Sequence, residues 1–318
     1  MPDTSSARDY RQAYSKPSER YKRFIKYRML LLMLLPGFIF LIIFNYIPMY
    51  GLVLAFKEFK ITGGIAESPW VGLKYFNKAF DDAHFYLVVK NTLIISFYKL
   101  VFGFPVPILF AVLLNELSSR RFKKWVQTIS YLPHFISWVV LSGIFITIFS
   151  LEGPINTMLQ ALGRLPIIFM ADEQYFRSIL VVTSIYQSFG WGSIIFLAAI
   201  AGIDPQLHEA AIMDGAGRFK RMIHITLPML VPVISIMMIL AMGSILDAGF
   251  DQIFNMYNSQ VLNVSDIIDT YVYRIGLINA NYSYSTAVGM FKSVVALILV
   301  LSVNRIVKMI GGNEHTLW

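Results

Sequence analysis

The chain has 318 residues, of which 56% are hydrophobic and only 14% charged, and its formal net charge is +8. A water-soluble fold of this size would carry about 25% charged residues. The composition therefore excludes an ordinary soluble globular protein and indicates an integral membrane protein. The absence of cysteine excludes disulfides, thiolate metal sites and cysteine nucleophiles.

Long stretches almost free of Asp, Glu, Lys and Arg predict membrane-spanning helices. A bilayer core about 30 Å thick needs roughly 20 apolar helical residues, and backbone groups in lipid must be paired within their own segment. The six predicted spans are Met29–Phe56, Asn91–Asn115, Val126–Leu151, Ser178–Ile203, Met222–Leu246 and Ile275–Asn304. Kinked or broken helices are expected at the prolines within these spans, which are Pro36, Pro105, Pro107, Pro133 and Pro232. The predicted fold class is an all-α integral membrane protein with six transmembrane helices.

The basic residues predict the orientation of the spans. An even number of spans places both termini on one side, and most of the 27 Lys and Arg residues fall on that side. They are Arg8, Arg11, Lys16, Arg20, Lys22, Arg23, Lys26, Arg28, Arg120, Arg121, Lys123, Lys124, Arg218, Lys220, Arg221, Arg305 and Lys308. Because loops enriched in Lys and Arg stay in the cytoplasm, both termini are predicted to be cytoplasmic. The positive charge is then a topology signal, and a nucleic-acid partner is disfavoured.

The segment before the first span is predicted to be a basic cytoplasmic tail over residues 1–28. Residues 1–20 are polar and nearly without aliphatic side chains, so we expect disorder there. The first apolar run is too long for a signal peptide, and no small-x-small cleavage site follows it. An uncleaved first helix is therefore favoured.

The loop between the fourth and fifth spans carries the clearest motif. Asp204 followed by Pro205 predicts a helix start, because Asp caps a helix N-terminus and Pro suits the first helical position. Glu209 lies within the short helix that follows, and Gly215 and Gly217 permit a turn with positive φ. Such a helix, which carries small alanine side chains and a carboxylate, could fit into a groove of another protein. An ordinary interfacial loop is the alternative.

The residues of this loop resemble the EAA motif of ABC importer permeases. In that family the loop is the coupling helix, which docks in a cleft of the cytoplasmic ATPase. The resemblance implies that residues 204–228 couple this chain to a separate ATPase. The residues assigned to coupling are Glu209, Ala210, Ala211, Asp214, Gly215, Ala216, Phe219, Leu227 and Pro228.

Other stretches are similar to the LplB-like branch of these permeases, which serves polysaccharides and complex oligosaccharides. They are Leu35–Phe40, Tyr46–Gly51, Gly190–Ile195 and Asp266–Arg274. The resemblance implies a type I ABC importer permease fold, with one six-span domain over residues 29–318, in a bacterial inner membrane. The implied cargo is an oligo- or polysaccharide, including acidic ones such as alginate or pectin fragments. An ion-gradient-driven secondary transporter is the alternative, disfavoured because the spans are almost free of Asp and Glu.

The same resemblance implies the partners. They are a second, non-identical six-span permease subunit, two cytoplasmic ATPase subunits, an extracytoplasmic solute-binding protein, the oligosaccharide and membrane lipid. The sequence has no phosphate-binding G-x-x-x-x-G-K-[ST] motif, so we expect ATP and Mg²⁺ on the ATPase subunits, no cofactor on this chain and no enzymatic activity of its own. The five histidines form no ligand pair, so no metal site is predicted.

Five residues within the spans are candidates for the substrate path. A lysine inside a span costs about 2.5–3.5 kcal/mol, so Lys99 and Lys292 must face a cavity, a carboxylate or the interface. They either snorkel or pair with Asp247 or Asp251, or they line the path and attract carboxylates of an acidic sugar. The other candidates provide aromatic faces and hydrogen bonds for a sugar, with ordinary helix packing as the alternative; they are Tyr186, Gln187 and Trp191.

Overall fold

The structure is a computed structural model that describes residues 26–311 of the chain. The expected disorder of residues 1–20 and nearly all of the predicted tail lie outside the described residues. Within them, helices form every regular element, and the β-pairing is limited to isolated bridges such as the one between Lys57 and Trp70. The all-α class is therefore confirmed. The chain divides into two compact units, one ending at Val53 and one beginning at Leu54.

The first unit contains all but the last three residues of the first predicted span. Helix α2 (Arg28–Leu41) continues through a π-helical turn, η2 (Ile42–Tyr46), into α3 (Ile47–Met49) and the 3-10 helix η3 (Tyr50–Phe56). Pro36 lies inside α2 without ending it. This composite helix, Arg28–Phe56, is long and apolar enough to cross a membrane.

The second unit contains four further helices of sufficient length and apolarity to span a bilayer. Each overlaps one predicted span, with ends that differ by up to eight residues, as at Ala83 where the prediction began at Asn91. The composite helices are Ala83–Asn115, Glu173–Ala201, Arg218–Gly243 and Tyr282–Arg305. Their components are α6 (Ala83–Tyr98), η4 (Lys99–Gly103) and α7 (Pro105–Asn115), then α11 (Glu173–Ala201), then α13 (Arg218–Arg221), η6 (Met222–Thr226) and α14 (Leu227–Gly243), and finally α18 (Tyr282–Gly311).

The third predicted span is broken, as its proline suggested. Helix α8 (Arg120–Tyr131) passes through a 3-10 turn at Leu132–Phe135 into α9 (Trp138–Ile148), and the two parts are bent by 104°. Pro133 occupies the start of that turn, where its missing N–H and fixed φ end the α-helical ladder. The described residues therefore contain five candidate spans, or six if this bent pair crosses the membrane as one.

Short helices connect the spans of the second unit, and some of them contribute to its core. They are α4 (Gly64–Glu67), α5 (Lys74–Phe80), α10 (Pro154–Ala161), α12 (Pro205–Met213), α15 (Phe250–Met256), α16 (Leu262–Ser265) and α17 (Ile268–Tyr273). Helix α15 buries Ile253 and Met256 in a cluster with Phe176 and Leu180 of α11. The segment after α14 is therefore an integral part of the packing.

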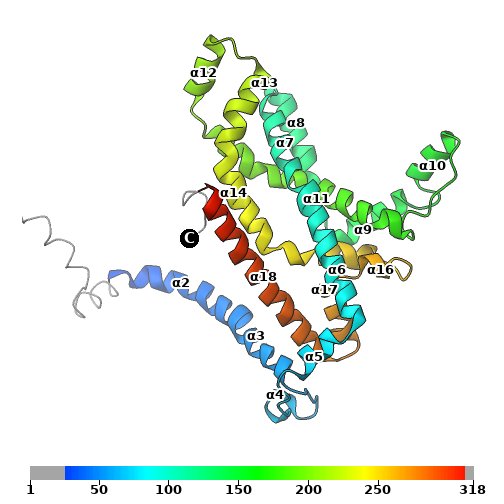
Figure 1. The fold of residues 1–318 in the computed structure, drawn as a ribbon. Coiled ribbons are helices and arrows are strands. Elements are labelled where there is room, and N and C mark those ends of the chain that lie inside the picture. Colours follow the sequence, from blue (N-terminus) through cyan, green and yellow to red (C-terminus); the bar gives the residue numbers. More distant parts are fainter. Residues whose placement is uncertain (1–25, 312–318) are drawn as a thin grey trace, which may run out of the picture. The chain divides into compact units, whose positions relative to one another are not determined.

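Two pairs of long helices organise the rest of the unit. Helices α7 and α11 pack together through a cluster that includes Ile108, Phe196 and Leu230. Helices α14 and α18 lie side by side, and α12 stands at one end of the unit, beyond α13 (Figure 1). Residues 204–228, called the α12 loop below, are therefore separated from the middle of the spans, where Lys99 and Lys292 lie.

Candidate functional site

The α12 loop begins as the sequence predicted. The side chain of Asp204 accepts a hydrogen bond from the backbone N–H of Gln206 at 3.0 Å, and Pro205 stands in the first turn of α12. This bond satisfies one of the N–H groups that a helix start leaves unpaired. The loop therefore presents a defined helix rather than an irregular connection.

A glycine turn ends α12. Gly215 has φ +76°, and the N–H of Ala216 donates to the carbonyl of Ala211 at 2.8 Å, which is the pattern of a glycine-based helix stop. The prediction of a positive φ at Gly217 was wrong. Gly217 has φ −67° and ψ 167°, an extended conformation that precedes α13. Only one residue of this turn needs the freedom of glycine.

The loop and the helix that follows it expose several large apolar side chains. No residue of α12 is buried, and Met213, Ile212 and Phe219 keep 87%, 53% and 69% of their surface exposed. Glu209 is exposed on the same helix. Exposed apolar side chains beside a carboxylate are typical of a docking surface for another protein.

The structure divides the coupling residues assigned by sequence into two groups. Glu209, Ala210, Ala211, Asp214, Gly215 and Ala216 lie on α12 or its turn, and Phe219 lies on α13. Leu227 and Pro228 instead form the first turn of α14, where Leu227 packs against the α7–α11 cluster. The loop and its span are continuous, because α13, η6 and α14 follow one another without a break.

Lys99 lies at the centre of a hydrogen-bond network in the middle of the second unit. Its Nζ donates to the carbonyl of Ala248 at 2.7 Å and to Oε1 of Gln252 at 2.5 Å. Gln252 is buried and in turn donates to the carbonyl of Leu180 and to Oγ1 of Thr183. Lys99 therefore joins the α6–α7 span to the bend that follows α14 and, through Gln252, to α11.

Lys292 is held by two carboxylates. Its Nζ donates to Oδ1 of Asp247 at 2.8 Å and to both carboxylate oxygens of Asp269, each at 2.8 Å. The pairing with Asp247 was one of the alternatives that the sequence left open. Asp251 is not a partner of Lys292, and the pairing with Asp269 of α17 was not foreseen.

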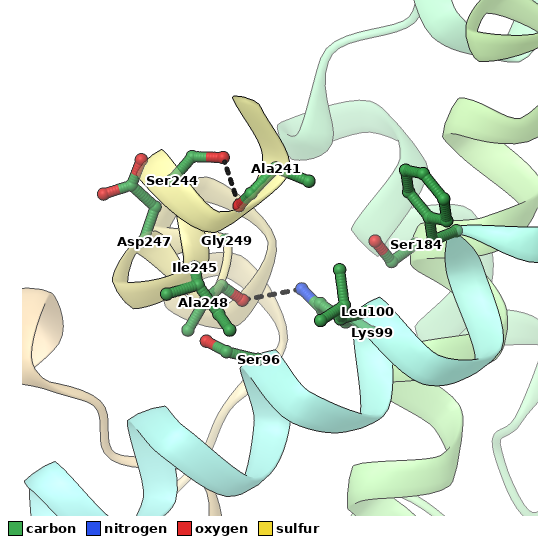
Figure 2. A pocket seen from close by; sticks show the side chains of 11 residues that line it. Ser96, Lys99, Leu100, Ser184, Ala241, Ser244, Ile245, Asp247, Ala248 and Gly249 are labelled. Atoms are coloured by element: carbon green, nitrogen blue, oxygen red, sulfur yellow. Dashed lines mark hydrogen bonds between the residues drawn. The ribbon is translucent and has the colours of Figure 1, made fainter. Parts of the chain in front are cut away.

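A cavity of about 340 Å³ is lined both by Lys99 and by Asp247, the partner of Lys292. It lies among η4, α11 and the bend after α14, and its wall includes Lys99, Ser184, Ser244 and Asp247. Figure 2 shows the Nζ of Lys99 directed toward the carbonyl of Ala248 at the edge of this cavity. Its lining combines hydroxyl and charged groups with apolar side chains.

A second hollow, of about 460 Å³, lies beside the bend between α8 and α9. Gln187 lines it together with His134, Trp138, Asp251 and Asn255. Gln187 therefore lies among polar and aromatic groups.

The two aromatic candidates lie near the same bend. The ring of Trp191 stacks on His134 with centroids 4.7 Å apart and planes 3° from parallel. Tyr186 contacts Phe145 of α9 edge to face at 5.8 Å. Both side chains pack against neighbouring rings and remain about half exposed.

A charged cluster that sequence reasoning missed lies where the start of α6 meets the two ends of α17. The buried Asp266 accepts from Arg274 and from His84, with His84 Nε2 at 2.8 Å. Burial alone would lower the pKa of Arg274, but its hydrogen bonds and charge pairing with Asp266 raise it. The only sequence signal was that Asp266 and Arg274 are the first and last residues of a stretch similar to the LplB-like permeases. This cluster ties α17 to the start of α6.

A neighbouring carboxylate, Asp82, is held by two tyrosines. Its Oδ2 accepts from Tyr271 at 2.6 Å and from Tyr284 at 3.1 Å. Burial would raise the pKa of Asp82, yet these hydrogen bonds and one from the N–H of His84 outweigh it and lower the pKa. Asp82 therefore stays ionised and fixes the start of α6 against α17 and α18.

The sequence is similar to known transport proteins. The family model described as "Binding-protein-dependent transport system inner membrane component" matches residues 103–312. The polygalacturonan/rhamnogalacturonan transport system permease protein YteP of Bacillus subtilis (strain 168) is 45% identical over 290 residues, which cover 91% of this chain and 90% of YteP. Protein LplB of the same strain is 45% identical over 280 residues, covering 88% of each chain.

The fold is similar to that of a solved transporter. A chain in the crystal structure of a bacterial ABC transporter involved in the import of the acidic polysaccharide alginate superposes with a TM-score of 0.86 and 40% sequence identity. The match covers 92% of this chain and 99% of that chain. The resemblance to ABC importer permeases of the LplB-like branch is therefore confirmed.

Proposed function

Because the chain belongs to the family of binding-protein-dependent transport system inner membrane components, we propose that it carries oligo- or polysaccharides, acidic ones included, across the bacterial inner membrane. It is a permease subunit of an ABC transporter and not an enzyme. The observation that carries the cargo assignment is the identity of 45% over nine-tenths of the chain to a polygalacturonan/rhamnogalacturonan permease. The similarity to an importer of an acidic polysaccharide supports it independently.

The energy for transport comes from two cytoplasmic ATPase subunits, which bind ATP and Mg²⁺. The α12 loop is the contact with them, since its exposed Met213, Ile212 and Phe219 provide apolar surface beside Glu209. Residues 204–228 and both termini then lie in the cytoplasm, and the distribution of Lys and Arg supports this orientation.

The remaining partners follow from what one chain lacks. Five or six spans are few to enclose a path for an oligosaccharide, so a second, homologous permease subunit completes it. A solute-binding protein, on which the family depends by its description, delivers the cargo from outside.

The substrate path runs past the two hollows in the middle of the second unit. The cavity beside Lys99 offers hydroxyl groups and charge, with Lys292 reaching its wall through Asp247. The hollow beside Gln187 offers amides, with the stacked ring of Trp191 near it and Tyr186 one position before Gln187. Aromatic faces and hydrogen-bonding groups together suit the C–H surfaces and hydroxyls of sugars.

Transport proceeds by alternating access. Closure of the ATPase subunits moves the α12 loop, and because α13, η6 and α14 are continuous, the motion reaches the spans that line the path. The ion-gradient alternative is not retained, since the family couples transport to a binding protein and an ATPase.

The decisive experiment is reconstitution of the chain with its partner subunits in proteoliposomes. Uronate and neutral oligosaccharides, each delivered by the binding protein, are expected to stimulate ATP hydrolysis and to appear inside the vesicles. The proposal fails if no ATPase co-purifies with the chain from its native membrane. It also fails if no saccharide stimulates hydrolysis.

A further inference from the structure

The ion cluster around Lys292 is asymmetric in its exposure. Asp269 Oδ1 and Oδ2 both accept from Lys292, and the side chains of Asp269 and Lys292 are only 25% and 16% exposed. Asp247 contributes a single oxygen, and its side chain is 67% exposed. One carboxylate is thus a shielded, two-oxygen partner, and the other is an open, one-oxygen partner.

The open partner lies on the wall of the cavity. Asp247 belongs to the tight bend after α14, where Ala248 and Gly249 have φ +45° and +89°. Lys99 anchors this bend from the other side by donating to the carbonyl of Ala248 (Figure 2). The backbone of Asp247 is therefore fixed, while its carboxylate remains free to leave Lys292 by a side-chain rotation.

The hydrogen-bonding capacity of Lys292 is full. An ammonium group has three N–H donors, and the structure provides three carboxylate oxygens within 2.8 Å. Another anion can bind Lys292 only by replacing one of these oxygens. Replacing Asp247 leaves a solvated carboxylate, whereas replacing Asp269 would strand a shielded one, so the exchange favours Asp247.

We propose that Lys292 forms a carboxylate-binding subsite that Asp247 occupies in the absence of cargo, and that a carboxylate of an acidic saccharide takes the place of Asp247 during passage. This inference rests on the proposed function and adds the group that sets the preference between acidic and neutral saccharides. Asp247 is the competing carboxylate in the subsite, and Asp269 holds Lys292 in position. The exchange is an ion-pair substitution in which no covalent bond changes.

The test compares charge removal at the two carboxylates. The complete transporter, with unchanged binding protein, is assayed in proteoliposomes for uptake of a uronate oligosaccharide and a neutral oligosaccharide of equal length. Because every variant uses the same binding protein, the preference of that protein enters each ratio equally. It therefore cancels when the ratio of a variant is compared with that of the wild type. Asp247→Asn is expected to raise the acidic-to-neutral ratio about fivefold, because an amide competes less strongly than a carboxylate for the ammonium.

Two further variants serve as comparisons. Asp269→Asn removes the same charge from the shielded position and is expected to leave the ratio unchanged or lower it, because the competing carboxylate of Asp247 remains and Lys292 loses the partner that holds it in position. Glu58→Gln removes a carboxylate from an exposed ion pair with Lys74, and the ratio should not change. If Asp247→Asn does not assemble, Asp247→Ser provides the same measurement with a smaller neutral side chain.

The outcomes separate this inference from the function on which it rests. An unchanged or lower ratio in Asp247→Asn, or an equal rise in Asp269→Asn, overturns the subsite while leaving saccharide transport intact. If the wild-type assembly transports no saccharide, the proposed function itself fails. A rise confined to the substitutions at Asp247 supports the subsite.

Discussion

Lys99 connects three elements through one ammonium group. It donates to the carbonyl of Ala248 and to Gln252, and the amide of Gln252 continues to Leu180 and Thr183. The sequence located this lysine but could not name its partners, because a backbone carbonyl and an amide leave no charge signal. Its closest contacts are structural, although it also lines the cavity.

Substitution of Lys99 by Met should destabilise the protein. The side chains are similar in length, but Met leaves the carbonyl of Ala248 and Oε1 of Gln252 without their donor, at a cost of about 2 kcal/mol. The midpoint of unfolding by SDS in mixed micelles measures the loss. Lys90→Met, at an exposed lysine, is the control. An unchanged midpoint in Lys99→Met would show that the network contributes no stability.

At the scale of elements, glycine sets the distance between α8 and α11. A Cβ on Gly190 would lie 2.0 Å from the carbonyl oxygen of Ser130, closer than any real contact. The structure accounts for Gly190 by packing, as is usual where small residues bring membrane helices together.

Gly190→Ala should therefore separate α8 from α11. The methyl group cannot fit without a shift of backbone, and overpacking of this kind costs about 1–3 kcal/mol. Gly143→Ala on α9 is a matched control, because a Cβ there meets no atom within 4 Å. Unfolding midpoints of the two variants are compared in the same detergent. Equal midpoints would contradict the close approach.

The α12 turn offers a similar pair of glycines for a functional test. Gly215 has φ +76°, which a β-branched residue adopts only with strain, whereas Gly217 has an ordinary φ of −67°. Gly215→Val should misplace α12 and reduce cargo-stimulated ATP hydrolysis about tenfold, while Gly217→Ala should leave it unchanged.

Basal hydrolysis by the ATPase subunits distinguishes uncoupling from loss of the complex. We expect it to persist in the Gly215→Val assembly, since the ATPase carries its own active site. Full stimulation by cargo in this variant would mean that the geometry of the α12 turn does not matter for coupling.

Across the whole molecule, the sequence predicts what depends on local pattern and misses what depends on assembly. Stretches almost free of charged residues located the spans, because a charged side chain inside a span makes insertion into lipid less favourable. The 104° bend between α8 and α9 had only Pro133 as its signal. The contact of Lys292 with Asp269 joins two elements that only the packing of α17 beside α18 brings together.

The orientation of the chain is a further property of the whole molecule, and the absence of cysteine makes it directly measurable. Met213→Cys on the α12 loop and Leu165→Cys between α10 and α11 introduce single thiols at positions that are 87% and 86% exposed. If loops rich in Lys and Arg face the cytoplasm, a membrane-impermeant maleimide added to intact spheroplasts should label only the thiol at position 165. The thiol at position 213 should react after lysis, and less so when ATPase subunits cover α12. Labelling of position 213 in intact spheroplasts would show that the topology is the reverse of the predicted one. The α12 loop could then not contact a cytoplasmic ATPase.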